Sequence, residues 1–524
     1  MTMKKFKGLL LISAIFFLLG GCDKDFIELN KNPYAVTDLD PALLFAGAQR
    51  SHLGGWETEH TIIQQFVNPY NSGATQGPNF NADIDNFNNG KWDGSYPTVI
   101  KNQIQALALL EGVNDRPNLR SMLRIWKAQV FMGLVDTHAD IPYFDAGQAF
   151  LKGSEYFYPS YDDDAAIYAD LEKELKESIA ALSPNGDFVS ADLFYGANGS
   201  AKSTTAAVQV EKWKKLGNSL LLRLGMRYSK LDAAKAKTIV TDAFNGGVMK
   251  SNDDNAWVKY DGTLFTNGAN GGLVNNNPYF YYAAEPFVDH LKATNDPRGQ
   301  FLVATYANPA NPLADPAPNT KLADQFGAPV GVLNTDLTKP AYRGAKGGGY
   351  NYSQMNVNVV ASLTAPDFWV TYPEVSLLLA EAAQRGWIPG GEAAAKQYYE
   401  DGIKADIKRY ALYPKSSTIS DADIATFLAS PGVAYNAADA LKLINTQLWI
   451  AYIRNGTQAW ANFRRSGFPA LSPNKYNNNL NGGFIRRLSY PDYELAQNKT
   501  NYQNAVTAIG GTDNLTARVF WDKE

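Results

Sequence analysis

The stretch Val208–Tyr228 reads VQVEKWKKLGNSLLLRLGMRY, and it decides the fold class. Its apolar residues recur every three or four positions, which is the spacing that places side chains on one face of an α-helix. The stretch therefore predicts a long amphipathic helix. Because such a helix buries its apolar face against other helices, we look for partners on both sides of it.

Helical periodicity dominates the rest of the chain. Helix–short turn–helix units are expected at Tyr96–Leu110 with Leu119–Val135, Tyr372–Arg385 with Ala393–Tyr410, and Ala437–Ile453 with Thr457–Arg464. Further helices are expected over Pro41–Val67, Asp162–Leu182 and Ala233–Phe244. These units indicate tetratricopeptide-like packing, although their spacing is irregular and the consensus side chains of that repeat are missing.

Long stretches rich in Asn, Gly, Pro and Tyr separate the helices, at Asn68–Gly94, Ser183–Thr205, Gly246–Pro286 and Asn308–Thr364. Loops of this length are usually functional or disordered, and the aromatic content argues against disorder. We therefore expect a mainly α protein: a single large domain of tetratricopeptide-like helix pairs with long irregular loops and few short strands.

The composition excludes several classes of protein. The 524 residues include 48 basic and 52 acidic side chains, and a net charge of -4 does not suit a nucleic-acid binder. A hydrophobic content of 45% is enough for a large core. Only one stretch is long and apolar enough to consider as a membrane span, so a polytopic membrane protein is excluded. The single cysteine, Cys22, excludes an intrachain disulfide.

The N-terminus reads MTMKKFKGLLLISAIFFLLGGC. Three lysines, a short apolar stretch and two glycines have the layout of a signal peptide, which we expect to span residues 1–21. The Leu-Gly-Gly-Cys sequence resembles a lipobox, so Cys22 is the expected site of lipid attachment and the first residue of a mature domain at 22–524. Acyl chains would anchor that domain to a membrane. The alternative is a plain secretory signal with an incidental cysteine.

Eight short motifs follow one another along the chain. They are Asn30–Pro33 with Leu43 and Leu44, Trp92–Tyr96 with Ile100 and Asn102, Ala139–Tyr143, Trp213–Leu220 with Arg223, Asn295–Arg298, Glu374 with Leu378 and Ala380–Ala382, Arg464–Pro469, and Arg486–Pro491. In this order they resemble the SusD/RagB family of Bacteroidetes outer-membrane lipoproteins, most closely its SusD-like branch. Ala139 stands where the family has glycine.

The resemblance implies a function as well as a fold. It implies a lipid-anchored, cell-surface protein of the outer membrane that captures an oligosaccharide and delivers it to a SusC-like TonB-dependent transporter. Its membrane contact would be the lipid anchor only. RagB-like relatives serve peptide uptake, so capture of a peptide or another non-glycan nutrient by the same lid architecture is the alternative.

No catalytic constellation is visible in the sequence. The four histidines form no H-E-x-x-H pattern, and there is no G-x-S-x-G elbow or phosphate-binding loop. A glycosidase needs two carboxylates about 5–10 Å apart across a sugar. The candidate pairs, Asp136 with Asp140 and Asp253 with Asp254, are no more than chance among 52 acidic residues. We therefore expect no enzyme activity, no cofactor and no catalytic metal.

Sugar binding has a different requirement, because a pyranose stacks on an aromatic ring while its hydroxyls bond to amides or carboxylates. Aromatic residues mixed with asparagine occur in the ligand loops at about 68–94 and 246–286. We expect these loops to meet and form a ligand platform. The candidate ligand-binding residues are Trp92, Tyr279, Tyr281, Tyr70, Trp257 and Asn277. The alternative is that these rings anchor the loops to the scaffold, and Trp92 also begins a helix motif.

The arginines of the motifs have a structural interpretation. Arg223, Arg464, Arg465, Arg486 and Arg487 lie in predicted helix or turn contexts, where guanidinium groups fix geometry through ion pairs and hydrogen bonds. Glu374 and Glu381 are seven positions apart and so share a helix face. We expect them to be structural partners of such arginines rather than a catalytic pair.

Overall fold

Helix α11 (Ala206–Arg227) contains the stretch that decides the fold class, and it packs against several other helices. Its neighbours are α8 (Pro117–His138), α10 (Asp164–Ala181), α12 (Ala233–Gly246) and α17 (Tyr372–Gln384). The structure is a computed structural model that describes residues 39–50, 56–69, 78–271, 282–337, 339–342, 345–346, 349–474, 476, 480 and 483–524. Residues Pro41–Glu524 form one compact unit.

The sequence of α11 explains how it is placed. Thr205 caps its start, where the Thr205 Oγ1 atom accepts a hydrogen bond from the backbone N–H of Val208 at 3.3 Å. Gly217 lets α10 come close, because a Cβ atom there would lie 2.6 Å from Cγ1 of Ile179. The apolar face is fully buried, and it includes Trp213, Leu216, Leu220 and Leu224. The predicted amphipathic helix is confirmed.

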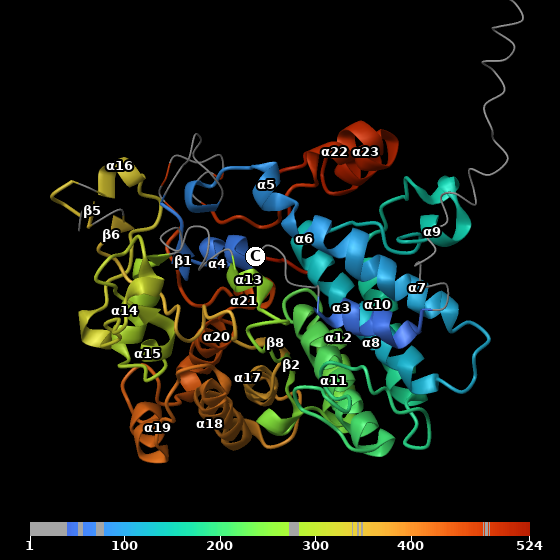
Figure 1. The fold of residues 1–524 in the computed structure, drawn as a ribbon, viewed down its shortest axis with the longest axis horizontal. Coiled ribbons are helices and arrows are strands. Elements are labelled where there is room, and N and C mark those ends of the chain that lie inside the picture. The colour runs from blue at the N-terminus through green and yellow to red at the C-terminus, as the bar shows by residue number, and fades with distance from the viewer. Residues whose placement is uncertain are drawn as a thin grey trace, which may run out of the picture. The chain divides into compact units, whose positions relative to one another are not determined.

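The other long helices pack as neighbours along the chain. Helix α7 (Lys101–Leu109) follows a π-helical segment at Ser95–Ile100 and contacts α8, which in turn contacts α10. The C-terminal helices are α18 (Gly391–Arg409), α20 (Ala440–Ala451) and α21 (Gly456–Ser466). Helix α17 contacts both α18 and α20, and it joins them to α11 (Figure 1).

Short elements make up the long segments between these helices. The short helices are α3 (Pro41–Arg50), α4 (Trp56–Ile62), α5 (Asp85–Asn88), α6 (Gly90–Gly94), α9 (Ala149–Lys152), α13 (Gly268–Gly271), α14 (Glu285–Ala293), α15 (Gly299–Leu302), α16 (Asn334–Leu337), α19 (Asp421–Leu428), α22 (Asp492–Gln497) and α23 (Lys499–Ala508). The mainly α fold class with few short strands is confirmed.

The strands are two to four residues long and pair antiparallel. One sheet has the order β1 (Phe66–Val67), β3 (Tyr282–Ala283), β7 (Gln354–Met355), β4 (Val303–Ala304). The other described strands pair as β2 (Ala256–Val258) with β8 (Asp367–Val370) and β5 (Ala345–Lys346) with β6 (Gly349–Tyr350). These strands connect loops that are far apart in the sequence.

One predicted helix is wrong at its end. The sequence pattern predicts a single helix over Pro41–Val67, but the structure has α3 and α4, and the last two residues form strand β1. Gln64 has a φ of 56°, which takes the chain out of the helical conformation. Phe66 then pairs with Ala283 of β3. This long-range pairing overrides the local helical periodicity.

Buried ion pairs join the helices. Arg223 of α11 binds Glu374 of α17 through two contacts, Nε to Oε1 at 2.6 Å and Nη2 to Oε2 at 2.8 Å. Arg465 of α21 binds Glu381 of α17 in the same two-pronged way, at 2.7 and 2.8 Å. Burial alone would raise the pKa of Glu381, but Arg465 and Arg385 lower it to about 2. The predicted structural role of these acids is confirmed.

The three other arginines of the motifs also have structural partners. Arg464 donates to the backbone carbonyl of Arg486 at 2.6 Å, and Arg486 pairs with Asp522. Arg487 pairs with Asp513. These contacts tie the C-terminal segment to α21, as expected for guanidinium groups that fix loop geometry.

Within the described part of the chain, no helix is both long enough and apolar enough to cross a membrane. The expected signal peptide at 1–21 and the lipid-attachment residue Cys22 lie outside the described residues. Both stay predictions from the sequence.

Candidate functional site

Trp92, the first candidate ligand residue, lies in a nearly covered position. Its side chain is only 4% exposed. It packs against Tyr96 with ring centres 4.8 Å apart, against His138 at 5.5 Å, and against Tyr161 at 5.8 Å. The ring is nearly covered because α6 turns this side chain toward the end of α8, as the alternative of an anchoring role expects, and ligand binding by Trp92 stays a prediction.

Trp257 is also a scaffold residue. It is 8% exposed and stacks on Phe368 across the β2–β8 pair, with ring centres 5.6 Å apart. The pairing of β2 with β8 therefore nearly covers this ring, as the alternative of an anchoring role expects, and ligand binding by Trp257 stays a prediction. The candidates Tyr70, Asn277, Tyr279 and Tyr281 lie outside the described residues.

Among the described residues, the two predicted ligand loops come together where strands β1 and β3 pair. Val67, just before the first loop, pairs with Tyr282 at the end of the second, because β1 and β3 are neighbours. Trp92 and Trp257 pack on different partners, so the structure does not bring these two rings into one platform.

An aromatic pocket of about 290 Å³ lies beside Trp92. We call it the aromatic pocket. Six of its lining residues are aromatic: Trp92, Tyr96, Tyr156, Phe157, Tyr158 and Tyr493. Three are polar, Glu494, Gln497 and Asn498, and the rest are Pro97, Pro142, Ala146, Gly147, Ala149 and Pro159. Trp92 therefore contributes to a pocket wall, even though its ring is nearly covered.

The exposed rings of the pocket come from the segment that follows α9. Gly153 has a φ of 107° and turns the chain after α9 into a 3-10 turn at Ser154–Tyr156. Phe157 and Tyr158 come next, and their side chains are 61% and 56% exposed. Large rings this open are available to a ligand, whereas the ring of Trp92 is nearly covered.

Two asparagines hold this segment in place. Asn498 donates from Nδ2 to the carbonyl of Pro159 at 2.9 Å, and Asn501 donates to the carbonyl of Tyr158 at 2.9 Å. Both lie at or in α23, which follows directly after α22. The backbone under the rings is therefore fixed while the rings stay exposed.

Two tyrosine hydroxyls of the aromatic pocket, those of Tyr96 and Tyr493, bond to the protein. Tyr96 donates to the carbonyl of Pro142 at 2.7 Å, and Tyr493 donates to Asp93 Oδ1 at 2.6 Å. Burial raises the pKa of Tyr96 well above its usual value, and the nearby Glu494 carboxylate raises it further. These tyrosines are therefore neutral, and their rings have fixed orientations that suit stacking.

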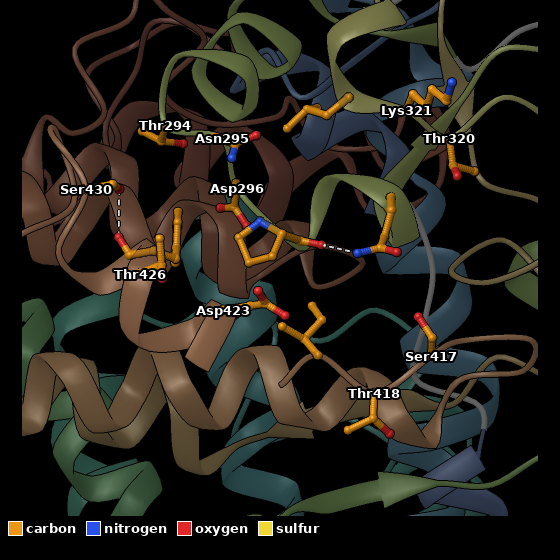
Figure 2. Close-up of a pocket in the computed structure, with 15 residues that line it drawn as sticks. Thr294, Asn295, Asp296, Thr320, Lys321, Ser417, Thr418, Asp423, Thr426 and Ser430 are labelled. Carbon is orange, nitrogen blue, oxygen red and sulfur yellow. Dashed lines mark hydrogen bonds between the residues drawn. The ribbon is translucent and has the colours of Figure 1, made fainter. Parts of the chain in front are cut away.

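A second hollow lies at the Asn295–Arg298 motif (Figure 2) and has a volume of about 560 Å³. Hydroxyl and amide side chains line it, including Thr294, Asn295, Thr418, Thr426 and Ser430. Its aromatic residue is Phe427, which is 4% exposed. This polar hollow offers hydrogen bonds but no open ring on which a sugar could stack.

The motif residues beside the polar hollow are already used by the scaffold. Asp296 pairs with Arg298 at 2.6 Å, and Arg298 also pairs with Asp406 at 2.7 Å, all three being buried. Figure 2 shows Asp296 beside Asn295, with Asp423 across the hollow. The motif therefore supports the fold here rather than presenting a charged group to a ligand.

Three carboxylates gather at the start of α10, where ligand atoms of Asp140, Asp163 and Asp164 lie within 4.8 Å of one another. Each carboxylate accepts a hydrogen bond from a backbone N–H group. Asp140 accepts from Asp164, Asp163 accepts from Ala166, and Asp164 accepts from Phe520. These bonds account for the cluster as a helix-start structure, and we assign it no metal.

The described lining of the aromatic pocket contains one carboxylate, Glu494, whereas glycoside hydrolysis uses two. Its rings can stack on a sugar face, and Gln497 and Asn498 can bond to hydroxyls. Sequence reasoning missed the Tyr156–Tyr158 run, although three successive aromatics between Gly153 and Pro159 were a visible signal.

Solved structures with the same architecture include carbohydrate-binding proteins. One, named as a chitin-binding protein, is 28% identical, with a TM-score of 0.76 over 92% of this chain and 100% of that one. A Bacteroidetes AC2a SusD-like protein is 25% identical, with a TM-score of 0.78 over 93% and 100%. A chitin-binding SusD homologue from Flavobacterium johnsoniae, 22% identical, has a similar fold, with a TM-score of 0.72 over 92% and 99%. A search among curated proteins found no match.

The SusD-like family model, described as "Starch-binding associating with outer membrane", matches residues 33–491. The match covers most of the chain and includes the helix pairs, the buried arginine–glutamate pairs and the pocket residues from Trp92 to Pro159. The pocket residues Tyr493, Glu494, Gln497 and Asn498 follow the end of the match. This chain therefore belongs to the SusD-like family.

Proposed function

We propose that this protein captures oligosaccharides at the cell surface in the aromatic pocket, without cleaving them. The observation that carries the proposal is the pair of open rings at Phe157 and Tyr158, beside the amides of Gln497 and Asn498. Ring stacking and amide hydrogen bonds are the two contacts that a pyranose needs. A pocket with these contacts and one carboxylate binds a sugar and releases it unchanged.

The family supports this proposal and suggests the first ligand to test. The matching family is described as starch-binding, and a relative of 28% identity is named as a chitin-binding protein. We therefore propose starch-type and chitin-type oligosaccharides as first candidates. The acetamido group of a chitin sugar carries a methyl group that suits an aromatic wall, and an amide that can bond to Asn or Gln.

We further propose that the captured sugar passes to a SusC-like TonB-dependent transporter and that the protein is held at the outer membrane by lipid on Cys22. The lipobox-like sequence before Cys22 supports the anchor. The family description, which places its members in association with the outer membrane, supports the location.

Calorimetric titration of the full-length protein in detergent tests the binding site. We expect a chitin or starch oligosaccharide to bind, and Phe157→Ala and Tyr158→Ala to weaken binding about 2- to 10-fold each, since a stacked ring contributes about 0.5–1.5 kcal/mol. The melting temperature should stay nearly unchanged because both rings are exposed.

Tyr342 provides the matched control, because it is an exposed ring that lines none of the described pockets. Tyr342→Ala should bind as the wild type does. Release of reducing ends from the same oligosaccharides would contradict the proposed non-enzymatic role. Wild-type binding by both pocket variants would contradict the proposed site.

A further inference from the structure

Among the described lining residues of the aromatic pocket, one is charged, and its charge is negative. This residue is Glu494, and the described lining includes no Lys, Arg or His. Its Oε2 atom accepts from Tyr161 at 2.8 Å and, at 3.5 Å, from Asn498. No described residue donates a hydrogen bond to its Oε1 atom. One oxygen of Glu494 is thus held by the protein and the other is available.

The groups around Glu494 do not neutralise it. Tyr161 is a neutral donor, because burial and the charge of Glu494 raise its pKa far above the usual value. Burial raises the pKa of Tyr96, and the charges of Glu494 and Asp162 raise it further. The charges that act on this part of the pocket wall are therefore negative. Burial also raises the pKa of Glu494 itself, which means that its negative charge is poorly solvated there. A positive group placed beside it would restore part of the lost solvation.

Lys152 is a cation at the pocket rim. Its Nζ atom lies 5.0 Å from the centre of the Tyr156 ring, and its side chain is exposed and outside the pocket lining. An exposed lysine is strongly hydrated and screened by salt. Its charge acts in the opposite direction to that of Glu494 on a charged ligand, so the test includes a Lys152 variant.

From this arrangement we propose that the aromatic pocket selects sugars by charge, and that Glu494 is the residue that sets the selection. The pocket favours a sugar with a free ammonium group, accepts neutral sugars, and rejects uronates and sulfated sugars. The inference rests on the proposed function, because it assigns the chemical class of ligand to the same pocket.

Two physical effects act in the same direction. Aromatic faces are negative and attract an ammonium group held above them, most strongly where water is excluded. A carboxylate with an available oxygen forms a charge-assisted hydrogen bond to the same ammonium group. A uronate or sulfate would meet the negative faces and the negative Glu494 together. The same features would also suit a lysine side chain of a peptide, which the experiment must separate from a sugar.

The test compares β-1,4-linked tetrasaccharides of the same ring geometry, titrated calorimetrically into the full-length protein near neutral pH. The series is the glucosamine, N-acetylglucosamine, glucose and glucuronate tetramers. We expect the glucosamine tetramer to bind most tightly, about tenfold or more above the glucuronate tetramer, with the neutral pair between them. Glu494→Gln keeps the side-chain shape and can still accept a hydrogen bond from Tyr161, so it removes the charge while the pocket geometry stays close to that of the wild type.

In Glu494→Gln the charge preference should shrink to about twofold or less, whereas Lys152→Gln should keep the wild-type order. Two outcomes would overturn this inference and leave the proposed function standing. In one, neutral sugars bind, and the cationic and acidic tetramers bind equally well. In the other, the preference for the cationic tetramer persists in Glu494→Gln. If neither these tetrasaccharides nor the starch oligosaccharide of the binding test binds, the proposed function fails and this inference fails with it. If a lysine tetrapeptide binds, its binding requires Glu494, and no sugar binds, then the ligand of the pocket is a peptide and the sugar assignment is overturned.

Discussion

Trp92 and Tyr158 line the same pocket, but their side chains have different roles. Trp92 is nearly covered by Tyr96, His138 and Tyr161, so it supports the pocket from inside the protein. Tyr158 projects an open ring and is held only through its backbone by Asn501. An aromatic ring can thus be part of the core at one position and stay open at another, depending on how the surrounding segments pack.

For Trp92 we predict a loss of stability rather than a selective loss of binding. Trp92→Ala should lower the free energy of unfolding by about 3–5 kcal/mol, because it removes a large buried side chain. Trp92→Phe should lose less, since a ring remains. Urea unfolding followed by circular dichroism measures both. A Trp92→Ala protein as stable as the wild type but unable to bind sugar would show instead that this ring contacts the ligand directly.

Asp164, at the start of α10, should make the stability depend on pH. Burial raises its pKa from 3.8 to about 7, and burial also raises that of Asp140 to about 6. A carboxyl whose pKa is higher in the folded state binds its proton more tightly there. Its contribution to stability is therefore full below about 4 and is lost as the pH rises through about 7.

Asp164→Asn keeps an oxygen for the Phe520 N–H but cannot titrate. We expect the free energy of unfolding of the wild type to fall more steeply than that of Asp164→Asn between pH 4 and pH 7. Urea titrations across this range give both curves. Parallel curves would show that the Asp164 carboxyl has an ordinary pKa in the folded protein.

At the scale of elements, Arg223 and Glu374 connect α11 to α17 where both helices are buried. Glu374→Gln should destabilise the protein by about 3–5 kcal/mol, because it leaves the Arg223 charge buried without its partner. The exposed pair Lys396–Glu400 of α18 is the matched control, and Glu400→Gln should cost at most about 1 kcal/mol. Equal effects of the two substitutions in urea unfolding would contradict the structural role of the buried pair.

Local periodicity was enough to predict the long helices, and α11 begins and ends within two residues of the prediction. Local signals fail where distant residues decide the conformation. Phe66 and Val67 continue a helical pattern, but they form a strand because β3 pairs with them. Glu374 and Glu381 could be assigned to arginines because their spacing on a helix face is itself a local property.

The candidate site could be predicted much less well than the fold. Aromatic residues in loops are visible in any sequence, but which of them is exposed depends on packing between distant segments. The carbonyl of Pro159 is held by Asn498, 339 positions later in the chain. The side chains of Phe157 and Tyr158 are exposed in the segment that this contact holds, whereas Tyr96, His138 and Tyr161 cover the ring of Trp92. Neither outcome can be read from the residues next to each ring.

At the scale of the whole molecule, the sequence predicts that Cys22 carries the membrane anchor. Cys22→Ala should leave folding intact and release the protein from the outer membrane, because each acyl CH₂ lost from the bilayer removes about 0.8 kcal/mol of binding. Membrane fractionation in cells lacking the partner transporter measures this. A Cys22→Ala protein that still sediments with the outer membrane in those cells would refute lipid attachment at this residue.

The central claim is that the aromatic pocket is where a sugar binds. A crystal structure of the protein with a bound chitin or starch oligosaccharide tests it most directly. The account predicts a sugar ring stacked on Phe157 or Tyr158, with hydroxyl or acetamido contacts to Gln497 or Asn498. A sugar bound instead in the polar hollow at Asn295–Arg298, with the aromatic pocket empty, would contradict it.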